Sequence, residues 1–268
     1  LRTSFSMAKS VMATLIGVAV ERGDIESLDV PITDHLADLA ERDPRFAEIT
    51  LRHLLTMSSG LAFEEGSSPW ADPANTYYAT DLRRAALEQT DIERPPGEVF
   101  RYNDWNTVLL GLLLERATGT SPADYLSEHV WVPMGAEVDG SWSLDSTESG
   151  FEKSFVGVNA SAADWARFGM LYLHDGVGAD GTVVLPAWFV DEATLLDGDG
   201  DPSEEYQYHW WVDVGHGGFY AAGDHCQFVY VAPDHDTVVV RTGDGCGDLD
   251  GFEWVPVLRS VAAATDTG

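Results

Sequence analysis

The sequence has very little positive charge. Lysine occurs only twice, as Lys9 and Lys153, and lysine and arginine together number 15 against 45 aspartates and glutamates, so the formal net charge is −30. Nucleic acid is not expected as a partner, because binding a phosphate backbone requires a basic face. An acidic shell almost without lysine is typical of proteins from salt-loving organisms, where salt screens the repulsion between like charges. We expect a halophilic protein; the alternative is an acidic protein without salt adaptation.

Cysteine and long apolar runs are scarce as well. Two cysteines, Cys226 and Cys246, cannot build a disulfide framework, and no Cys/His spacing suggests zinc, so we expect neither a metal nor a cofactor. No apolar run approaches the ~20 residues of a membrane span, so we do not expect a membrane as a partner. The chain opens at Leu1 without a signal-peptide pattern, which favours the cytoplasm unless an N-terminal segment is missing. The oligomeric state is left open.

The hydrophobic residues, 44% of the chain, suffice for one large domain or two closely packed ones. Their periodicity predicts helices, the clearest of which span 6–21, 105–119, 161–176 and 253–264. Segments rich in β-branched and aromatic residues predict short strands at 217–223, 227–233 and 237–243. The turns between these segments are tight, so the strands must be antiparallel neighbours.

These elements predict an α/β (α+β) chain in three parts. Residues 1–24 hold the first helix and belong to an α/β region. Residues 25–154 form a mainly helical subdomain. Residues 155–268 return to the α/β region, with the antiparallel strands and a C-terminal helix that covers one face of the sheet.

The segment SFSMAKS, residues 4–10, places a serine three positions before one of the two lysines. On a helix, residues i and i+3 share a face, so the Lys9 amine can reach the Ser6 hydroxyl and take its proton. The apolar flank of Lys9 indicates partial burial, and a buried lysine loses its charge easily. A solvated helix lysine and an N-cap serine are the alternatives, because this spacing alone gives weak support.

Several further segments make the catalytic interpretation more specific. The chain resembles the serine β-lactamase-like hydrolases in SFSMAKS and then in ITLRHLLTMSSGL, RPPGEVFRYNDWNTVLLGLLLERATGTSPADYL, NASAADWARFGMLYL, YQYHWWV and FYAAGDHCQFVYVAPDHDTVVV. That family includes class C β-lactamases, D-alanyl-D-alanine peptidases, β-lactamase-like carboxylesterases and 6-aminohexanoate-dimer hydrolase. The resemblance implies the β-lactamase/penicillin-binding-protein fold, an antiparallel sheet flanked by helices plus an all-helical subdomain. The family has two sheet strands before the S-x-x-K helix, so this sheet either lacks an edge or the preceding part has been removed.

The resemblance implies roles for individual residues. Ser6 matches the family's nucleophile, Lys9 its partner on the helix, and Tyr102 the tyrosine of the Y-x-N element. A phenol held near an ammonium group can relay the serine proton to the leaving group. The third position of the element is Asp104 rather than asparagine, which puts the family's amide contact to substrate in doubt, and Asn103 is the alternative contact. Tyr102 alone would suggest only a core tyrosine in a turn.

The third family element is a strand edge beside the nucleophile, and two registers compete for it. Either Ala221–Gly223 or His216–Gly218 takes the place of the family's K-T-G or H-x-G. We favour the first, because FYAAG followed by Q resembles the esterase and oligomer-hydrolase branch. In that register Gly223 and the amide of Asp224 border an oxyanion hole with the Ser6 N–H, and Ala222 faces the substrate.

The departure at this strand bears on the substrate. β-Lactamases and peptidases use positive or hydroxyl-bearing residues there to hold a substrate carboxylate, which Ala221 and Ala222 cannot do, and the negative protein opposes an anionic substrate. We therefore expect a serine hydrolase that cleaves an ester or small amide bond of a small-molecule substrate through an acyl-enzyme on Ser6. The alternatives are a β-lactamase or D-alanyl-D-alanine peptidase, and a non-catalytic binding or sensor module of the same fold.

Two features stay open on the sequence alone. Cys226 and Cys246 lie near the same end of a predicted hairpin, so they either form a disulfide or remain two buried thiols. Four tryptophans either line an apolar cleft or pack in the core: Trp70, Trp131, Trp210 and Trp211.

Overall fold

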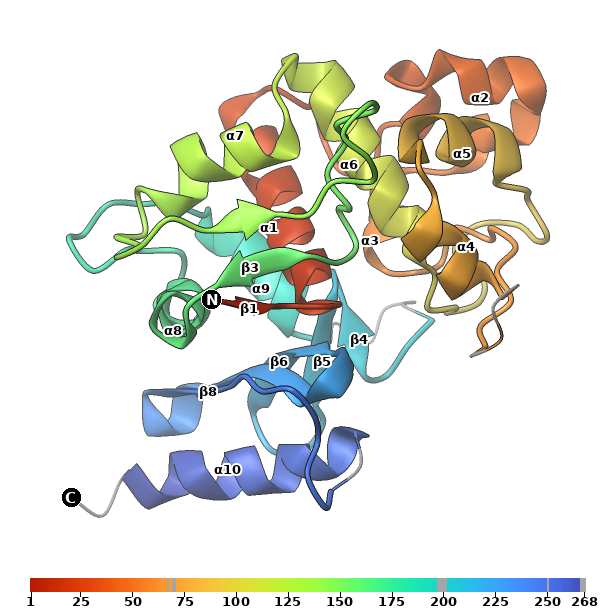
Figure 1. Cartoon of the computed structure of the whole chain (residues 1–268). Coiled ribbons are helices and arrows are strands. Elements are labelled where there is room, and N and C mark those ends of the chain that lie inside the picture. The colour runs from red at the N-terminus through yellow and green to blue at the C-terminus, as the bar shows by residue number, and fades with distance from the viewer. Residues whose placement is uncertain (67, 69–70, 197–201, 250, 266–268) are drawn as a thin grey trace.

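The structure, a computed structural model, describes residues 1–66, 68, 71–196, 202–249 and 251–265. Its main feature is a five-stranded antiparallel sheet in the order β4-β5-β6-β7-β8 (Figure 1). The strands are β4 (Tyr206–Gln207), β5 (Trp210–Asp213), β6 (Gly218–Gly223), β7 (Gln227–Ala232) and β8 (Thr237–Arg241). The order follows the sequence because each strand is joined to the next by a short turn, which brings consecutive strands together as antiparallel pairs.

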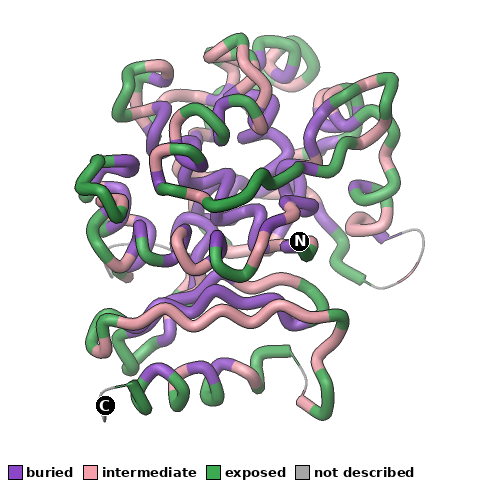
Figure 2. Tube along the Cα trace, turned by 60° about the vertical axis from the view of Figure 1, so that its left-hand side comes forward, coloured by how far each residue is buried: buried purple, intermediate pink, exposed green. Residues whose placement is uncertain are grey.

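The sheet is covered on both faces. Helix α10 (Trp254–Ala264) lies along one face, and α1 (Met7–Arg22) and α8 (Ala162–Leu173) pack on the other (Figures 1 and 2). Alternation along β7 explains this arrangement, because successive side chains of a strand point to opposite faces. Phe228 and Tyr230 pack with α10, whereas Val229 and Val231 join the larger core on the other face.

A second, small sheet contains the strand that leads into α1. It has the order β1-β3-β2 and consists of β1 (Arg2–Thr3), β3 (Val158–Ala160) and β2 (Ser141–Trp142). Beyond β1 the Ser4 amide donates to the Val158 carbonyl at 2.8 Å, which continues the pairing to the residue before α1. The start of α1 is thereby fixed against the middle of the chain.

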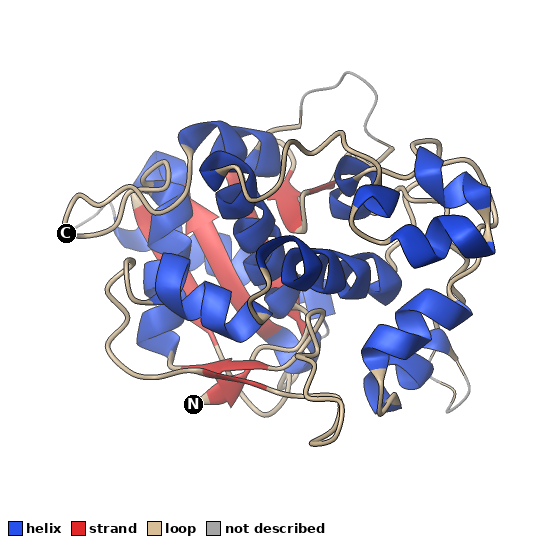
Figure 3. Cartoon of the chain, turned by 90° about the horizontal axis from the view of Figure 1, so that it is seen from above, coloured by secondary structure: helices blue, strands red, loops and turns tan. Residues whose placement is uncertain are grey.

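The remaining helices lie on the same side of the five-stranded sheet as α1, and one of them packs directly on β4 and β5 (Figures 1 and 3). They are α2 (Ala37–Arg42), α3 (Leu51–Leu55), α4 (Asp72–Tyr78), α5 (Leu82–Gln89), α6 (Asp104–Thr118), α7 (Pro122–Leu126) and α9 (Ala187–Thr194), with a π-helical turn at Ser127–Trp131. Helix α6 is buried along most of its length and packs against α1 and α3. Among the described residues, no helix combines the length and the apolar character needed to cross a bilayer.

The α/β fold class is confirmed, as are the helices predicted from periodicity and the three strands β6, β7 and β8. Strands β4 and β5 were not predicted. They are two and four residues long, and the segment that holds them is buried on both sides, so it lacks the alternation that marks a half-exposed strand.

Candidate active site

Ser6 stands at the N-terminal end of α1, directly after a sharp change in backbone direction. Phe5 has a φ of 46°, a left-handed conformation that is uncommon for an aromatic residue. Ser6 occupies the N-cap position of α1, yet its side chain makes no capping hydrogen bond. The hydroxyl instead accepts a hydrogen bond from the Lys9 ammonium group, with 3.3 Å between Nζ and Oγ. Ser6 is therefore the N-cap residue by position, but its side chain faces the lysine and does not cap the helix.

Lys9 is almost completely buried, with 1% of its surface exposed. Its Nζ has polar neighbours in Ser6 Oγ, the Phe155 carbonyl oxygen at 3.2 Å and Asp104 Oδ1 at 2.8 Å, and it also interacts with Tyr102. These neighbours come from the start of α1, the start of α6 and the segment before β3. The ammonium group has three N–H donors, so this arrangement can satisfy all of them.

The charge of Lys9 differs from the expectation. Burial lowers the pKa of Lys9. The negative charge of Asp104, together with Tyr102 and the hydrogen bonds to both, raises the pKa by more than burial lowers it, so the pKa lies above its ordinary value. The expectation that burial alone would neutralise the lysine is wrong, because a carboxylate is buried with it. Lys9 is an ammonium group in the resting protein.

Tyr102 lies beside this cation. The Lys9 Nζ is 4.8 Å from the centre of the tyrosine ring, and the ring stacks on Trp211 with 6.0 Å between centroids. Tyr102 is half-buried and, with Ser6, lines a pocket of about 570 Å³. The structure thus brings Tyr102 together with Ser6 and Lys9, from which it lies far away in the sequence.

Asn103 and Asp104 were both predicted to contact the substrate, and neither lines the pocket. Asn103 is buried, accepts the Trp105 amide through Oδ1 as the N-cap of α6, and donates to the Leu61 carbonyl. It does not line the pocket, so the idea that it replaces the missing amide contact is wrong. Asp104 does not line the pocket either, because its carboxylate is paired with Lys9.

The end of β6 and the turn after it form the opposite wall of the pocket. Ala222, Gly223 and Asp224 all line it. Gly223 packs so closely on the chain before Ser6 that a Cβ there would collide with the Ser4 carbonyl oxygen, so only glycine fits. His216–Gly218 lie at the other end of β6, and Gly217 is next to Asp234. Of the two registers, Ala221–Gly223 is therefore the one beside Ser6.

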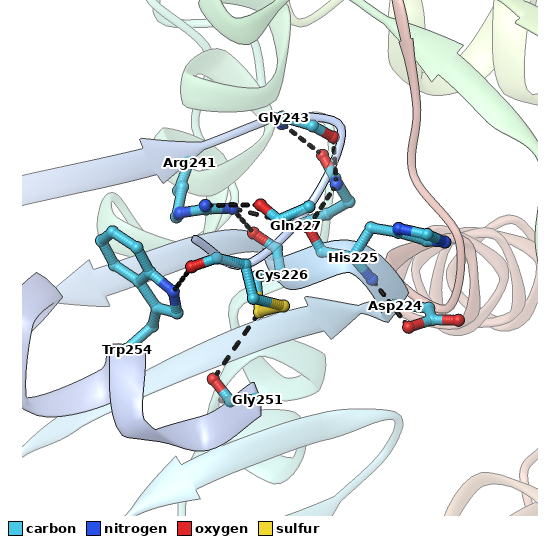
Figure 4. The surroundings of a disulfide bond; sticks show 10 residues. Asp224, His225, Cys226, Gln227, Arg241, Gly243, Gly251 and Trp254 are labelled. Atoms are coloured by element: carbon cyan, nitrogen blue, oxygen red, sulfur yellow. Dashed lines mark hydrogen bonds between the residues drawn. A yellow bond between two sulfur atoms is a disulfide. The ribbon is translucent and has the colours of Figure 1, made fainter. Parts of the chain in front are cut away.

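The turn after β6 is held by a buried glutamine and a disulfide (Figure 4). Gln227 donates to the carbonyls of His225 and Gly243 and accepts the Gly243 amide, which ties the turn to the loop after β8. Cys226 and Cys246 are joined, with 5.1 Å between their Cα atoms, and both line the pocket. The disulfide alternative is the one that the structure contains.

His209 and Phe155 also contact α1, although no pattern in the sequence assigns a role to either. The buried His209 ring lies between two carbonyls, with Nδ1 at 3.0 Å from the Lys9 oxygen and Nε2 at 3.3 Å from that of Leu54. Burial lowers the pKa of His209 to about 4, so the ring is neutral. YQYHWWV contains this histidine, but only three-dimensional contact links it to α1.

The tryptophans are distributed between the pocket and the core. Trp211 lines the pocket beside Ser6, whereas Trp210 is fully buried and packs against Phe168 and Tyr172. Trp131 lines a separate cavity of about 320 Å³ near the small sheet. Trp70 lies outside the described residues. Over the ranges that are described, no three or more His, Cys, Asp or Glu side chains converge as metal ligands would.

Comparison with known proteins finds a named hydrolase and a penicillin-binding protein. The chain is 27% identical over 296 aligned positions to 6-aminohexanoate-dimer hydrolase of Paenarthrobacter ureafaciens, covering 97% of this chain and 71% of that one. It is 28% identical to penicillin-binding protein 4 of Amycolatopsis lactamdurans, over 69% of this chain and 54% of that protein. The chain thus spans about seven tenths of the first relative and about half of the second.

Solved structures show the same fold. A Bacillus anthracis structure to which the name 6-aminohexanoate-dimer hydrolase is provisionally given superposes with a TM-score of 0.83 at 23% identity, covering 98% of this chain and 72% of that one. A family VIII carboxylesterase gives a TM-score of 0.73 at 15% identity, over 98% and 82% of the two chains. The family model described as Beta-lactamase matches residues 3–243, most of the chain. This protein belongs to the Beta-lactamase family.

Proposed function

We propose that this protein is a serine hydrolase that cleaves an ester or a small amide bond through an acyl-enzyme on Ser6. The observation that carries the proposal is the Ser6 hydroxyl, which does not cap α1 but accepts a hydrogen bond from Lys9. Ser6 also lines the 570 Å³ pocket. The names of the relatives, a dimer hydrolase and a carboxylesterase, agree with hydrolysis of this kind.

In the acylation step Ser6 Oγ attacks the substrate carbonyl carbon. Because Asp104 keeps Lys9 charged, Lys9 is not the group that removes the Ser6 proton. We assign Tyr102 as the group that accepts that proton and then gives it to the leaving group as the tetrahedral intermediate collapses. The Lys9 ammonium group stabilises the negative charge while it passes between Tyr102 and Ser6.

The oxyanion of the intermediate needs donors that are fixed before the reaction. The backbone amide of Ser6, at the start of α1, and the amide of Asp224, after β6, are the proposed donors. The close packing of Gly223 on Ser4 and the hydrogen bonds of Gln227 hold the two segments in one place. In deacylation a water molecule attacks the acyl carbon and transfers its proton to Tyr102, and the carboxylic acid leaves as Ser6 recovers its proton.

A second candidate is a β-lactamase or D-alanyl-D-alanine peptidase, which the similarity to penicillin-binding protein 4 favours. Against it, Ala222 lines the pocket at the strand edge and offers no group to bind a substrate carboxylate. The net charge of −30 also opposes an anionic substrate. Ester or amide hydrolysis therefore agrees better with the residues around Ser6.

The test assays a chromogenic short-chain ester, a linear chromogenic amide and a chromogenic cephalosporin side by side in molar KCl. We expect turnover of the ester or the amide, and its loss in Ser6→Ala. Ser260→Ala, which changes an exposed serine on α10, serves as the matched control and keeps full activity. Turnover of the cephalosporin alone would support the second candidate. Absence of turnover of all three, with no acylation of Ser6, would support the non-catalytic alternative.

A further inference from the structure

The pocket beside Ser6 has an unusual distribution of charge. Its described lining includes two carboxylates, Glu65 and Asp224, and contains no lysine or arginine. Both carboxylates are exposed at the rim. The cation beneath the pocket, Lys9, is already paired with Asp104 at 2.8 Å. A ligand in this pocket therefore meets uncompensated negative charge.

The wall of the pocket consists largely of aromatic rings. Trp211 is at its centre, with ring centroids 6.0 Å from Tyr102, 6.5 Å from Phe100 and 5.1 Å from Phe252. All four rings line the pocket, and none is fully buried. The face of an aromatic ring attracts a cation through its quadrupole, and several aromatic rings around one space can bind a quaternary ammonium group.

Arg241 contacts the disulfide loop but does not line the pocket. The Arg241 guanidinium lies 4.1 Å from the Trp254 ring and donates to the carbonyls of Cys226 and Gly245 (Figure 4). These contacts engage the guanidinium, and Arg241 is not among the residues that line the pocket.

Glu65 indicates that the negative charge is poorly compensated. Partial burial raises the pKa of Glu65, and the nearby charge of Asp104 raises it further, while Lys9 lowers it. A cation bound next to Glu65 would relieve both effects, because it would replace lost hydration and oppose the charge of Asp104.

We propose that this pocket selects esters or amides that carry a permanent or protonated ammonium group near the scissile bond, with the cation held between the aromatic wall and the carboxylates of Glu65 and Asp224. The proposal rests on the hydrolase function proposed above, because it names the substrate class of the same site. It also predicts that ammonium compounds without a scissile bond bind there.

The test uses pairs of molecules that have the same shape and differ only in charge, all at one fixed KCl concentration. In the first pair the cation is in the leaving group: acetylcholine is compared with the uncharged 3,3-dimethylbutyl acetate. In the second pair the cation is in the acyl group: phenyl 4-(trimethylammonio)butanoate is compared with the uncharged phenyl 5,5-dimethylhexanoate. We expect kcat/KM to be at least about tenfold higher for the charged member of one pair.

Variants identify the groups responsible. The charged-to-neutral ratio of kcat/KM should fall at least about threefold in Glu65→Gln and in Asp224→Asn. Asn at position 224 keeps the side-chain oxygen that accepts the His225 amide. Glu148→Gln is the matched control, because it removes the same charge from an exposed loop residue outside the pocket and should leave the ratio unchanged. A ratio near or below one in both pairs, or a ratio that neither pocket variant lowers, would overturn the proposal.

A binding measurement separates this proposal from the proposed function. Ser6→Ala is titrated with choline and with its neutral analogue 3,3-dimethyl-1-butanol, and the tryptophan fluorescence is followed. Tighter binding of choline by about tenfold supports the cation site even if no ester is hydrolysed. Equal binding of both compounds contradicts the cation site while leaving hydrolysis at Ser6 intact.

Discussion

The Lys9 ammonium group and the Asp104 carboxylate form a buried ion pair, with 2.8 Å between Nζ and Oδ1 and side-chain exposures of 1% and 12%. Asp104 stands where the family's Y-x-N element has an asparagine, so this pair is a departure from that element. Its consequence is electrostatic. The carboxylate reverses the effect of burial and keeps the lysine charged.

Replacing Asp104 by asparagine should move the pH dependence of the reaction. Asp104→Asn removes the largest effect that raises the pKa of Lys9, and burial, which lowers it, remains. Lys9 then loses its proton at a lower pH, so the alkaline limb of the kcat/KM profile should shift to lower pH. The rates are measured between pH 6 and about 11 and normalised by titration of Ser6.

The control for this shift is Asp213→Asn. Asp213 is also buried and pairs with Arg259 at 2.6 Å, but it does not line the pocket. Loss of either pair should destabilise the fold, by about 3–5 kcal/mol for a buried pair. Only Asp104→Asn should move the pH profile, and a profile that superposes on the wild type would refute the role given to Asp104.

Lys9 and Tyr102 should act as one unit. Lys9→Ala and Tyr102→Phe should each lower kcat by about 100-fold or more, because each removes part of the same proton transfer. The double variant should be little worse than either single one, since groups that share a step are not additive. Steady-state kinetics of the four proteins measures this coupling, and fully additive losses would show that the two residues act in separate steps.

The disulfide between Cys226 and Cys246 should stabilise the protein and its pocket wall. It closes a loop with a sequence separation of 20, for which the restriction of the unfolded chain is worth about 3 kcal/mol. The Cys226→Ala/Cys246→Ala variant should lose about that much free energy of unfolding in denaturant titration. Thiol titration of the unfolded wild type without reductant should find no free thiol, and the same sample after reduction should give two. Two free thiols before reduction would end the idea.

Salt should stabilise this protein well beyond physiological concentrations. With a net charge of −30, repulsion between carboxylates is strongest when screening is weakest. The melting temperature should therefore rise steadily from dilute buffer to molar KCl, and more than it does in an equally concentrated solution of an uncharged osmolyte. A melting temperature that is flat over this range would contradict the halophilic interpretation.

Local patterns were enough to predict much of the fold. Helix α1 and strand β7 show a clear period or a β-branched and aromatic composition, and the structure has both close to the predicted bounds. The two-residue strand β4 is too short for any period to be visible. Its place in the sheet depends on pairing with β5, which is a tertiary effect.

In the site, too, local contacts could be predicted and tertiary contacts could not. The spacing of Ser6 and Lys9 follows from helical geometry, so their contact could be predicted. The partner of Lys9 could not, because Asp104 is brought to it by the packing of α6 on α1. The sign of the pKa change depends on whether burial or that carboxylate dominates, and the sequence contains no distance from which to decide. The capping role of Asn103 was not predicted, because the residue lies inside the element that resembles the family's Y-x-N and was interpreted as a substrate contact.

Direct identification of the acylated residue tests the central claim. The protein is treated with a fluorophosphonate and, separately, quenched during turnover of a chromogenic ester, and the adducts are located by peptide mass mapping. The account predicts one adduct, on Ser6 in the segment SFSMAKS, and none in Ser6→Ala. An adduct on another residue, or turnover that persists in Ser6→Ala, would contradict it.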